Sequence, residues 1–207
     1  MDNKTYLEGA LEVLHQEDRD RIRFFIEMDK MKTIYRQTLL LDQSRTETDA
    51  EHSWHLAMSA PALEPHFPEG IDKDKVIRMC LVHDIVEIDA GDTFAYDKEG
   101  YKTKAIREEK AADRIYRLLP GEEGQRLRAY WEEFEEGRTP EAKIANSLDR
   151  LQPLLAHAYT GGVNWKSHKV VAEDVLVRME PIRQNLPDLW PMVEELVKRG
   201  KERDLLL

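Results

Sequence analysis

The sequence predicts an all-α domain, and three observations support that fold class. Apolar residues recur at helical spacing along most of the chain, and no convincing stretch alternates with period two. Ten Gly and nine Pro are few for 207 residues, which favours long helices over a turn-rich β architecture. The length suits one domain, because domains usually hold ~100 to 200 residues. Since no internal repeat or long linker divides the chain, we expect a single domain over residues 1–207.

The first clear helical pattern covers residues 19–38, and a loop over residues 39–48 follows it. We expect its apolar stripe to face the core; the stripe consists of Ile22, Phe25, Ile26, Met31, Ile34 and Tyr35. A second helix should begin after Thr48, because Thr48 as N-cap and Glu51 three residues later form a capping-box pattern. Pro61 should kink or end that helix, since proline lacks the backbone N–H that a helix interior needs.

The segment VIRMCLVHDIVEIDA follows Asp72 and is apolar on most faces. It predicts a buried central helix that stops at Gly91.

Five further helices are predicted in the second half of the chain. One ends near Leu119, and the next carries an apolar stripe that we interpret as core or dimer interface: Leu127, Tyr130, Trp131 and Phe134. Thr139 as N-cap with Pro140 at the first helical position opens another, which ends before the pair of glycines at 161–162. The last two are expected over residues 172–185 and 187–199.

The charge balance narrows the functional classes. Thirty-one Lys and Arg against 41 Asp and Glu give a net charge of −10. We therefore expect no binding to nucleic acid polymers or to anionic membranes, because both need a basic surface. A small phosphorylated ligand needs only a few local cations and stays possible. Cys80 is the only cysteine, and the N-terminus lacks the pattern of an export signal, so we expect a cytoplasmic protein.

Polar residues inside the predicted central helix need an explanation. His83, Asp84 and Glu87 lie among Leu81, Val82, Ile85 and Val86, where an unpaired carboxylate is strongly disfavoured. Glu87 follows His83 by one helical turn, so the two should share a face. A divalent cation would compensate the two carboxylates, and a buried ion pair with an arginine from another helix is the alternative.

Two further segments offer metal ligands. His52 and His55 lie three residues apart in the capped helix, and Asp149 is surrounded by Ala145, Leu148, Leu151 and Leu154. Asp149 could instead pair with Arg150 or face solvent. Together with the central helix, these segments offer two imidazoles and two carboxylates, a mixed set that suits Mn, Fe, Co, Ni, Zn or Mg. Adjacent His83 and Asp84 would point about 100° apart in a regular helix, so both reach one ion only if the helix passes it edge-on.

Three strings carry a resemblance to a known family. RTETDAEHSWH at 45–55, LVHDIVEIDAGDT at 81–93 and LDRLQP at 148–153 occur in an order and at separations that resemble the HD-domain metal-dependent phosphohydrolases. More narrowly, they resemble the 5'-deoxynucleotidase-like branch of that family. The resemblance covers about residues 28–162.

This resemblance implies a fold and a set of site residues. The fold is an HD-domain helical bundle of about five core helices plus peripheral helices, commonly a homodimer, with the core at about residues 19–162 and C-terminal helices over 163–207 packed on it. One divalent metal ion would be held by four residues: His52, His83, Asp84 and Asp149. Glu87 matches the residue that handles protons, Asp92 matches one near the sugar, and Arg36 lies near the position of an arginine that contacts phosphate.

The expected function is hydrolysis of (deoxy)nucleoside 5'-monophosphates to nucleoside and phosphate through a metal-activated water. Glu87 would give its proton to the departing sugar oxygen, because burial beside other carboxylates raises a carboxyl pKa. Two alternatives remain open: an HD-domain enzyme for another phosphomonoester or a cyclic phosphodiester, and a regulatory protein that binds metal and nucleotide without turnover. His55 could orient a metal ligand or simply pack against the backbone.

Overall fold

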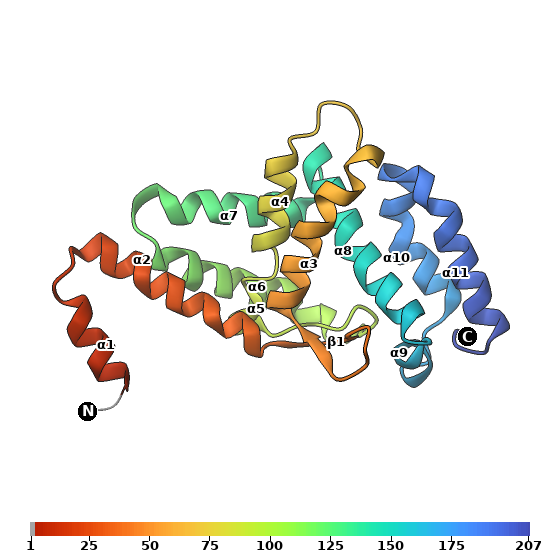
Figure 1. The fold of residues 1–207 in the computed structure, drawn as a ribbon, viewed down its shortest axis with the longest axis horizontal. Coiled ribbons are helices and arrows are strands. Elements are labelled where there is room, and N and C mark those ends of the chain that lie inside the picture. The colour runs from red at the N-terminus through yellow and green to blue at the C-terminus, as the bar shows by residue number, and fades with distance from the viewer. Residues whose placement is uncertain (1–2) are drawn as a thin grey trace.

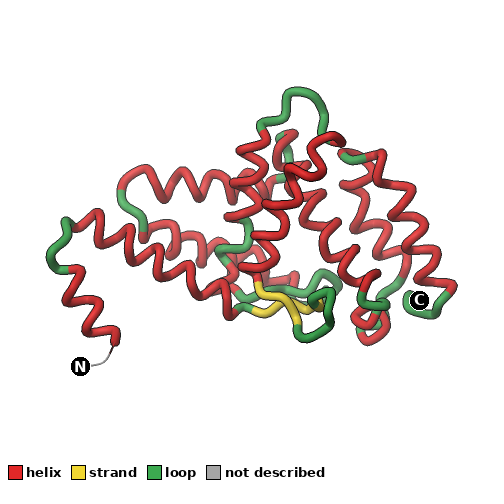
Figure 2. Tube along the Cα trace, in the orientation of Figure 1, coloured by secondary structure: helices red, strands yellow, loops and turns green. Residues whose placement is uncertain are grey.

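The structure is a computed structural model and describes residues 3–207 (Figure 1). Helices dominate it, and the only strands in the described part of the chain form one small antiparallel pair, so the all-α prediction is confirmed (Figure 2). The bundle is built mainly from seven helices: α3 (Asp49–Leu63), α4 (Lys73–Val82), α6 (Tyr101–Ile115), α7 (Gly121–Glu136), α8 (Pro140–Tyr159), α10 (Ala172–Asn185) and α11 (Trp190–Glu202).

Shorter elements complete the chain. They are the helices α1 (Asn3–Leu11), α2 (Gln16–Glu27), α5 (Glu87–Ala90) and α9 (Val163–Ser167), the strands β1 (Tyr35–Leu39) and β2 (Thr46–Thr48), and four 3-10 helices at Met28–Thr33, Glu64–His66, Tyr116–Leu118 and Pro187–Leu189. Between residues 3 and 207, none of the helices combines enough length with enough apolar character to cross a membrane.

The main core lies where α3, α4 and α8 meet α10 and α11. Its most deeply buried large side chains include Leu56, Met79, Ile144, Leu148 and Ile182. Burial of each such side chain contributes about 1.5–3 kcal/mol. A second cluster joins the end of α4 to α6 and α7 and includes Trp131. Because Trp131 and Phe134 are both buried, the stripe predicted on α7 is part of the core.

Both predicted helix starts are confirmed. The Thr48 hydroxyl accepts a hydrogen bond from the Glu51 N–H, and the Glu51 carboxylate accepts one from the Thr48 N–H, which completes the capping box of α3. Thr139 caps α8 in the same way by accepting from the Ala142 N–H. Pro61 does not end α3, which continues to Leu63.

The prediction of one helix over residues 19–38 is wrong. Helix α2 ends at Glu27, a 3-10 helix follows, and the chain then extends as β1. Tyr35 pairs with Thr48 and Leu39 pairs with Thr46, so β1 and β2 form a hairpin (Figure 2). Aromatic and β-branched residues such as Tyr35 and Thr38 favour strands, and pairing with β2 decides between the two conformations.

The apolar stripe of α2 does not face a core. Side chains of Phe25 and Ile22 are 76% and 38% exposed, and α2 has no buried residue. Helix α1 lies at the opposite end of the molecule from the C-terminal helices (Figure 1).

Candidate metal centre

A break in the predicted central helix shapes the site. Helix α4 ends at Val82, and residues 83–86 form a tight turn before α5 begins at Glu87. In this turn the Ile85 N–H bonds to the Val82 carbonyl and the Glu87 N–H bonds to the Asp84 carbonyl, each across three residues instead of four. The prediction of one continuous helix to Gly91 is therefore corrected. The tighter turn lets His83 and Asp84, although adjacent, approach the same point.

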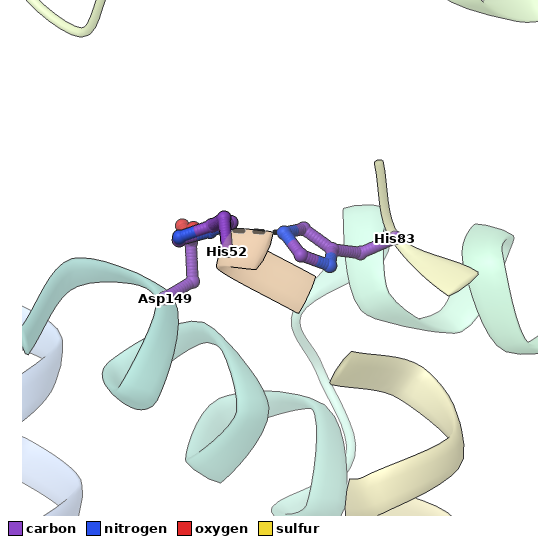
Figure 3. A group of neighbouring side chains, drawn as sticks. All are labelled: His52, His83 and Asp149. Carbon is purple, nitrogen blue, oxygen red and sulfur yellow. Dashed lines mark hydrogen bonds and ion pairs between the residues drawn. The ribbon is translucent and has the colours of Figure 1, made fainter. Parts of the chain in front are cut away.

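Two imidazole nitrogens converge on one carboxylate oxygen (Figure 3). His52 Nε2 lies 3.2 Å from Asp149 Oδ1, and His83 Nε2 lies 3.7 Å from the same oxygen. The ligand atoms of these three residues all lie within 4.8 Å of one another. They come from α3, the end of α4 and α8, and both histidines are buried. This group of one carboxylate and two imidazoles could hold a metal ion.

Asp84 approaches the same nitrogens from another side. Its Oδ2 atom lies 3.1 Å from His83 Nε2 and 3.8 Å from His52 Nε2. The same oxygen accepts a hydrogen bond of 2.7 Å from Arg36, so the arginine pair that the sequence left open does form at Asp84. The arginine comes from strand β1 and not from a helix.

Hydrogen bonds on the far side of each ring orient the two histidines. His52 Nδ1 lies 3.0 Å from Gln152 Oε1, and His83 Nδ1 lies 2.9 Å from the Cys80 carbonyl oxygen. The acceptor at each Nδ1 orients the ring so that Nε2 points toward the carboxylates. Such outer hydrogen bonds orient metal-ligating histidines in proteins.

Gln152 is a site residue that sequence reasoning missed. Its amide orientation is fixed because Nε2 donates to Glu47 Oε2 at 2.9 Å, which turns Oε1 toward His52. Nε2 also lies 3.3 Å from His55 Nδ1, so His55 contacts this network while its own side chain is exposed. The available signal was the position of Gln152 three residues after Asp149, on the same face of α8.

The electrostatics favour positive charge at the point of convergence. Burial alone would lower the pKa of His83, but Asp84 and Asp149 raise it well above the ordinary histidine value. Burial alone would raise the pKa of Asp149, but hydrogen bonds with His52 and His83 hold it well below its usual range. His83 Nε2 is a buried polar atom without a satisfactory hydrogen bond among the described residues. A divalent cation fits this donor set.

A second acidic group lies next to the first. Carboxylate oxygens of Asp49, Glu87 and Asp92 lie within 4.8 Å of one another. Sequence reasoning placed Glu87 on a face with His83, whereas the structure groups its carboxylate with Asp49 and Asp92. Burial raises the pKa of Glu87 well above its ordinary value, and the charges of Asp84 and Asp49 raise it further. Asp49 was missed because an acid in the first turn of a helix is usually a solvated residue.

Arg36 lies between the two acidic groups. Its Nη1 atom is 3.2 Å from Asp49 Oδ1 and 3.6 Å from Asp92 Oδ1, in addition to its bond with Asp84. One guanidinium does not neutralise this many buried acids. Burial, followed by the charge of Asp84, raises the pKa of Asp49 to about 8. The structure therefore places Arg36 and Asp92 close to Glu87, with Arg36 bound to carboxylates.

Comparisons with known proteins identify the family of the chain. A model of the HD domain matches residues 28–190. The human protein 5'-deoxynucleotidase HDDC2 is 32% identical over 111 residues, which cover 54% of this chain and 53% of that protein. The protein of the same name from Dictyostelium discoideum is 31% identical over 140 residues, which cover 65% of this chain and 74% of the relative. The matched region thus spans about half the length of the human relative.

Solved structures give a longer match. A predicted metal-dependent phosphohydrolase from Magnetospirillum magnetotacticum is 43% identical, with a TM-score of 0.87 over 92% of this chain and 95% of that one. A conserved hypothetical protein from Pyrococcus furiosus has a TM-score of 0.60 at 22% identity, over 86% of this chain and 99% of that one, and shows only that the fold is shared.

Proposed function

The chain belongs to the HD domain family, and on this premise we propose that it is a metal-dependent phosphohydrolase of nucleoside 5'-monophosphates, with deoxynucleotides as the first candidates. The observation that carries the proposal is the convergence of His52 Nε2 and His83 Nε2 on Asp149 and Asp84. The activity printed in the names of the human and Dictyostelium relatives supports the substrate class.

His52, His83, Asp84 and Asp149 would hold one divalent ion, drawn from Mn, Co, Fe, Ni, Zn or Mg. Such an ion supplies a Lewis acid for a phosphoryl oxygen and lowers the pKa of water from about 15.7 toward about 7. The chain's own contribution is to present two Nε2 lone pairs in fixed directions, which the hydrogen bonds of Nδ1 with Gln152 and with the Cys80 carbonyl secure.

Glu87 would act as the general acid. Water attacks phosphorus, the bond between phosphorus and the sugar 5'-oxygen breaks, and the proton of Glu87 goes to that departing oxygen. The proton that the attacking water loses then restores the acid form of Glu87. Burial and the charges of Asp84 and Asp49 raise the pKa of Glu87, which favours the protonated form that a general acid needs.

Arg36 and Asp92 would contact the substrate. Both line one cavity beside the metal-binding group, together with Gln37, Thr38 and Thr93. Arg36 would bind the reacting phosphate as a charge-assisted donor, and Asp92 would accept from a sugar hydroxyl. The pairing of Arg36 with Asp84 means that phosphate competes with a carboxylate for the guanidinium.

A phosphate-release screen tests the proposal. The metal-depleted protein is restored with each candidate ion and offered deoxy- and ribonucleoside 5'-monophosphates, sugar phosphates and cyclic nucleotides. We expect release from the 5'-monophosphates, lost on depletion and regained with at least one ion. The absence of release from any monophosphate with any ion would contradict the proposal. Turnover of cyclic nucleotides alone would favour the phosphodiesterase alternative.

We also propose a domain organisation, an oligomeric state and a location for the protein. We propose one domain over residues 1–207 that forms a homodimer in the cytoplasm. Exposed apolar side chains on α1 and α2, which include Tyr6 and Phe25, support a dimer, and the buried single cysteine Cys80 suits a reducing compartment. Light scattering of the purified chain would measure the number of subunits, and a monomeric mass would overturn the dimer.

A further inference from the structure

Two neighbouring cavities share part of their walls. One has a volume of about 50 Å³ and is lined by Arg36 and Asp92 of the candidate site. The other has a volume of about 480 Å³ and lies between α8, α10 and the segment before α6. Four residues line both cavities: Ala95, Tyr96, Arg150 and Arg178. The space beside the site therefore leads to a pair of arginines.

These two arginines lack close acidic partners. Arg150 Nη1 donates to the Asn146 carbonyl oxygen and to Asn146 Oδ1, and its nearest carboxylate oxygen, Asp149 Oδ2, is 3.9 Å away. The Arg178 side chain makes no hydrogen bond or ion pair with any residue in the described part of the chain, although it is only partly exposed. Arg128, by contrast, contacts three acidic side chains.

The two guanidiniums are brought together at one wall. Arg150 and Arg178 line the same two cavities, and like charges that share a cavity wall repel each other. The charge of Arg178 also acts on His157, whose pKa falls to about 4 mainly through burial. Asp174 is the one acid on the wall of the larger cavity, and Lys98 lies 3.6 Å from it. An anion between the arginines would relieve the repulsion, whereas a neutral group would not.

Asp149 faces the two histidines on one side and Arg150 on the other. Its Oδ1 atom faces His52 and His83, and its Oδ2 atom faces Arg150. Neighbouring residues on a helix point about 100° apart, so Arg150 extends from α8 in a different direction from Asp149 and lines the adjoining cavity. Two guanidiniums suit a phosphate, which offers more oxygens and more charge than one carboxylate.

We propose that Arg150 and Arg178 bind a second phosphate group of the substrate, so that the preferred substrates are phosphomonoesters carrying another phosphate at the end remote from the reacting one. This inference rests on the proposed phosphohydrolase function. It names the substrate class more narrowly, and Arg178 becomes a specificity-determining residue.

Kinetics with matched substrates test it. The pairs are a deoxynucleoside 3',5'-bisphosphate with its 5'-monophosphate, and hexose 1,6-bisphosphate with hexose 6-phosphate. We expect kcat/KM to favour the bisphosphate in at least one pair, and Arg178→Gln to reduce that ratio about 10- to 100-fold, which is the usual contribution of a hydrogen bond to a charged group. Arg183→Gln is the matched control, because Arg183 lies on the same helix, is exposed and bonds Glu180. This control should leave the ratio and the basal rate unchanged.

The outcomes separate the two proposals. An unchanged ratio in Arg178→Gln, or equal losses for both members of each pair, would overturn the second-phosphate site. If the wild type releases phosphate from no compound, the proposed function fails, and calorimetric titration of the metal-loaded protein with the same pairs still tests the site. If the wild type binds a bisphosphate more tightly than its monophosphate and Arg178→Gln loses this difference, the titration supports the inference. Equal affinity of the wild type for both members of each pair would overturn it.

Discussion

The two segments that supply the acidic residues nearest the histidines differ in their backbone. Helix α8 is continuous, and its regular period sends neighbours in different directions: Asp149 faces the histidines and Arg150 faces the adjoining cavity. The turn at residues 83–86 interrupts the helix between α4 and α5, and His83 Nε2 lies 3.1 Å from Oδ2 of the adjacent Asp84. A regular helix directs neighbouring side chains to different places, whereas a broken helix lets two neighbouring side chains reach the same point.

Loss of Asp149 should have the largest effect on the α8 side. Asp149→Asn removes the oxygen that lies near both Nε2 atoms, so we expect bound metal to be lost and phosphate release to fall about 100-fold or more. Metal analysis and the phosphate assay measure the two effects, and circular dichroism checks that the helices remain. Asp84→Asn should also lose metal, although Arg36 still pairs there with Asp49 and Asp92. Full metal content in both variants would remove these carboxylates from the ligand set.

Glu87 tests the role of the residue that follows the turn. Glu87→Gln removes the acidic proton but keeps the size of the side chain, so phosphate release should fall about 100- to 10,000-fold. The metal content should stay unchanged, because the Glu87 carboxylate groups with Asp49 and Asp92 and not with the histidines. Wild-type activity in this variant would exclude Glu87 as the acid.

The two histidines are oriented by different kinds of acceptor. His52 depends on the Gln152 side chain, whereas His83 depends on the backbone carbonyl of Cys80. Gln152→Leu should therefore weaken metal binding about 10- to 100-fold, while Cys80→Ala keeps its carbonyl and should leave the affinity unchanged. Gln152→Glu retains an acceptor for Nδ1 and should recover part of the affinity. Metal titration of the three variants measures this, and equal affinities for Gln152→Leu and the wild type would contradict the orienting role.

Glu47 gives the smallest effect, on the pH dependence of stability. Burial raises its pKa to about 7 from an ordinary 4.5. As pH rises through this interval, the unfolded chain releases the proton first, so the folded state loses stability relative to it. Between about pH 5 and about pH 8, the free energy of unfolding of the metal-depleted wild type should fall by roughly 1–3 kcal/mol more than that of Glu47→Gln. Urea unfolding at both pH values measures the difference. An equal change in the free energy of unfolding of both proteins would show that Glu47 does not destabilise the fold as pH rises.

Much of the fold was predictable because it depends on local signals. The caps at Thr48 and Thr139 and the helical apolar period locate α3 and α8, which bring His52 and Asp149 into the bundle. The same signals missed β1, because its extended form depends on pairing with a segment farther along the chain. They also missed the turn after Val82, whose apolar residues continue a helical pattern through the break.

The sequence was enough to select candidate ligands, but not the residues that contact them. Spacing and apolar surroundings selected His83, Asp84 and Asp149. Asp49 carries no local signal of burial, since an acid in the first turn of a helix usually faces solvent, and its contact with Arg36 of β1 depends on the tertiary structure. Gln152 shares a face with Asp149, but its contact with His52 depends on the packing of α3 against α8.

The small hairpin mechanically couples two parts of the site. Tyr35 pairs with Thr48, and the Asp49 N–H bonds to the Ile34 carbonyl oxygen, so the strand that carries Arg36 is joined to the first turn of the helix that carries His52. Fraying of this hairpin would withdraw the central guanidinium and loosen the helix start together. Amide hydrogen exchange at Arg36 and at the start of α3 should therefore proceed in one cooperative opening, and not residue by residue.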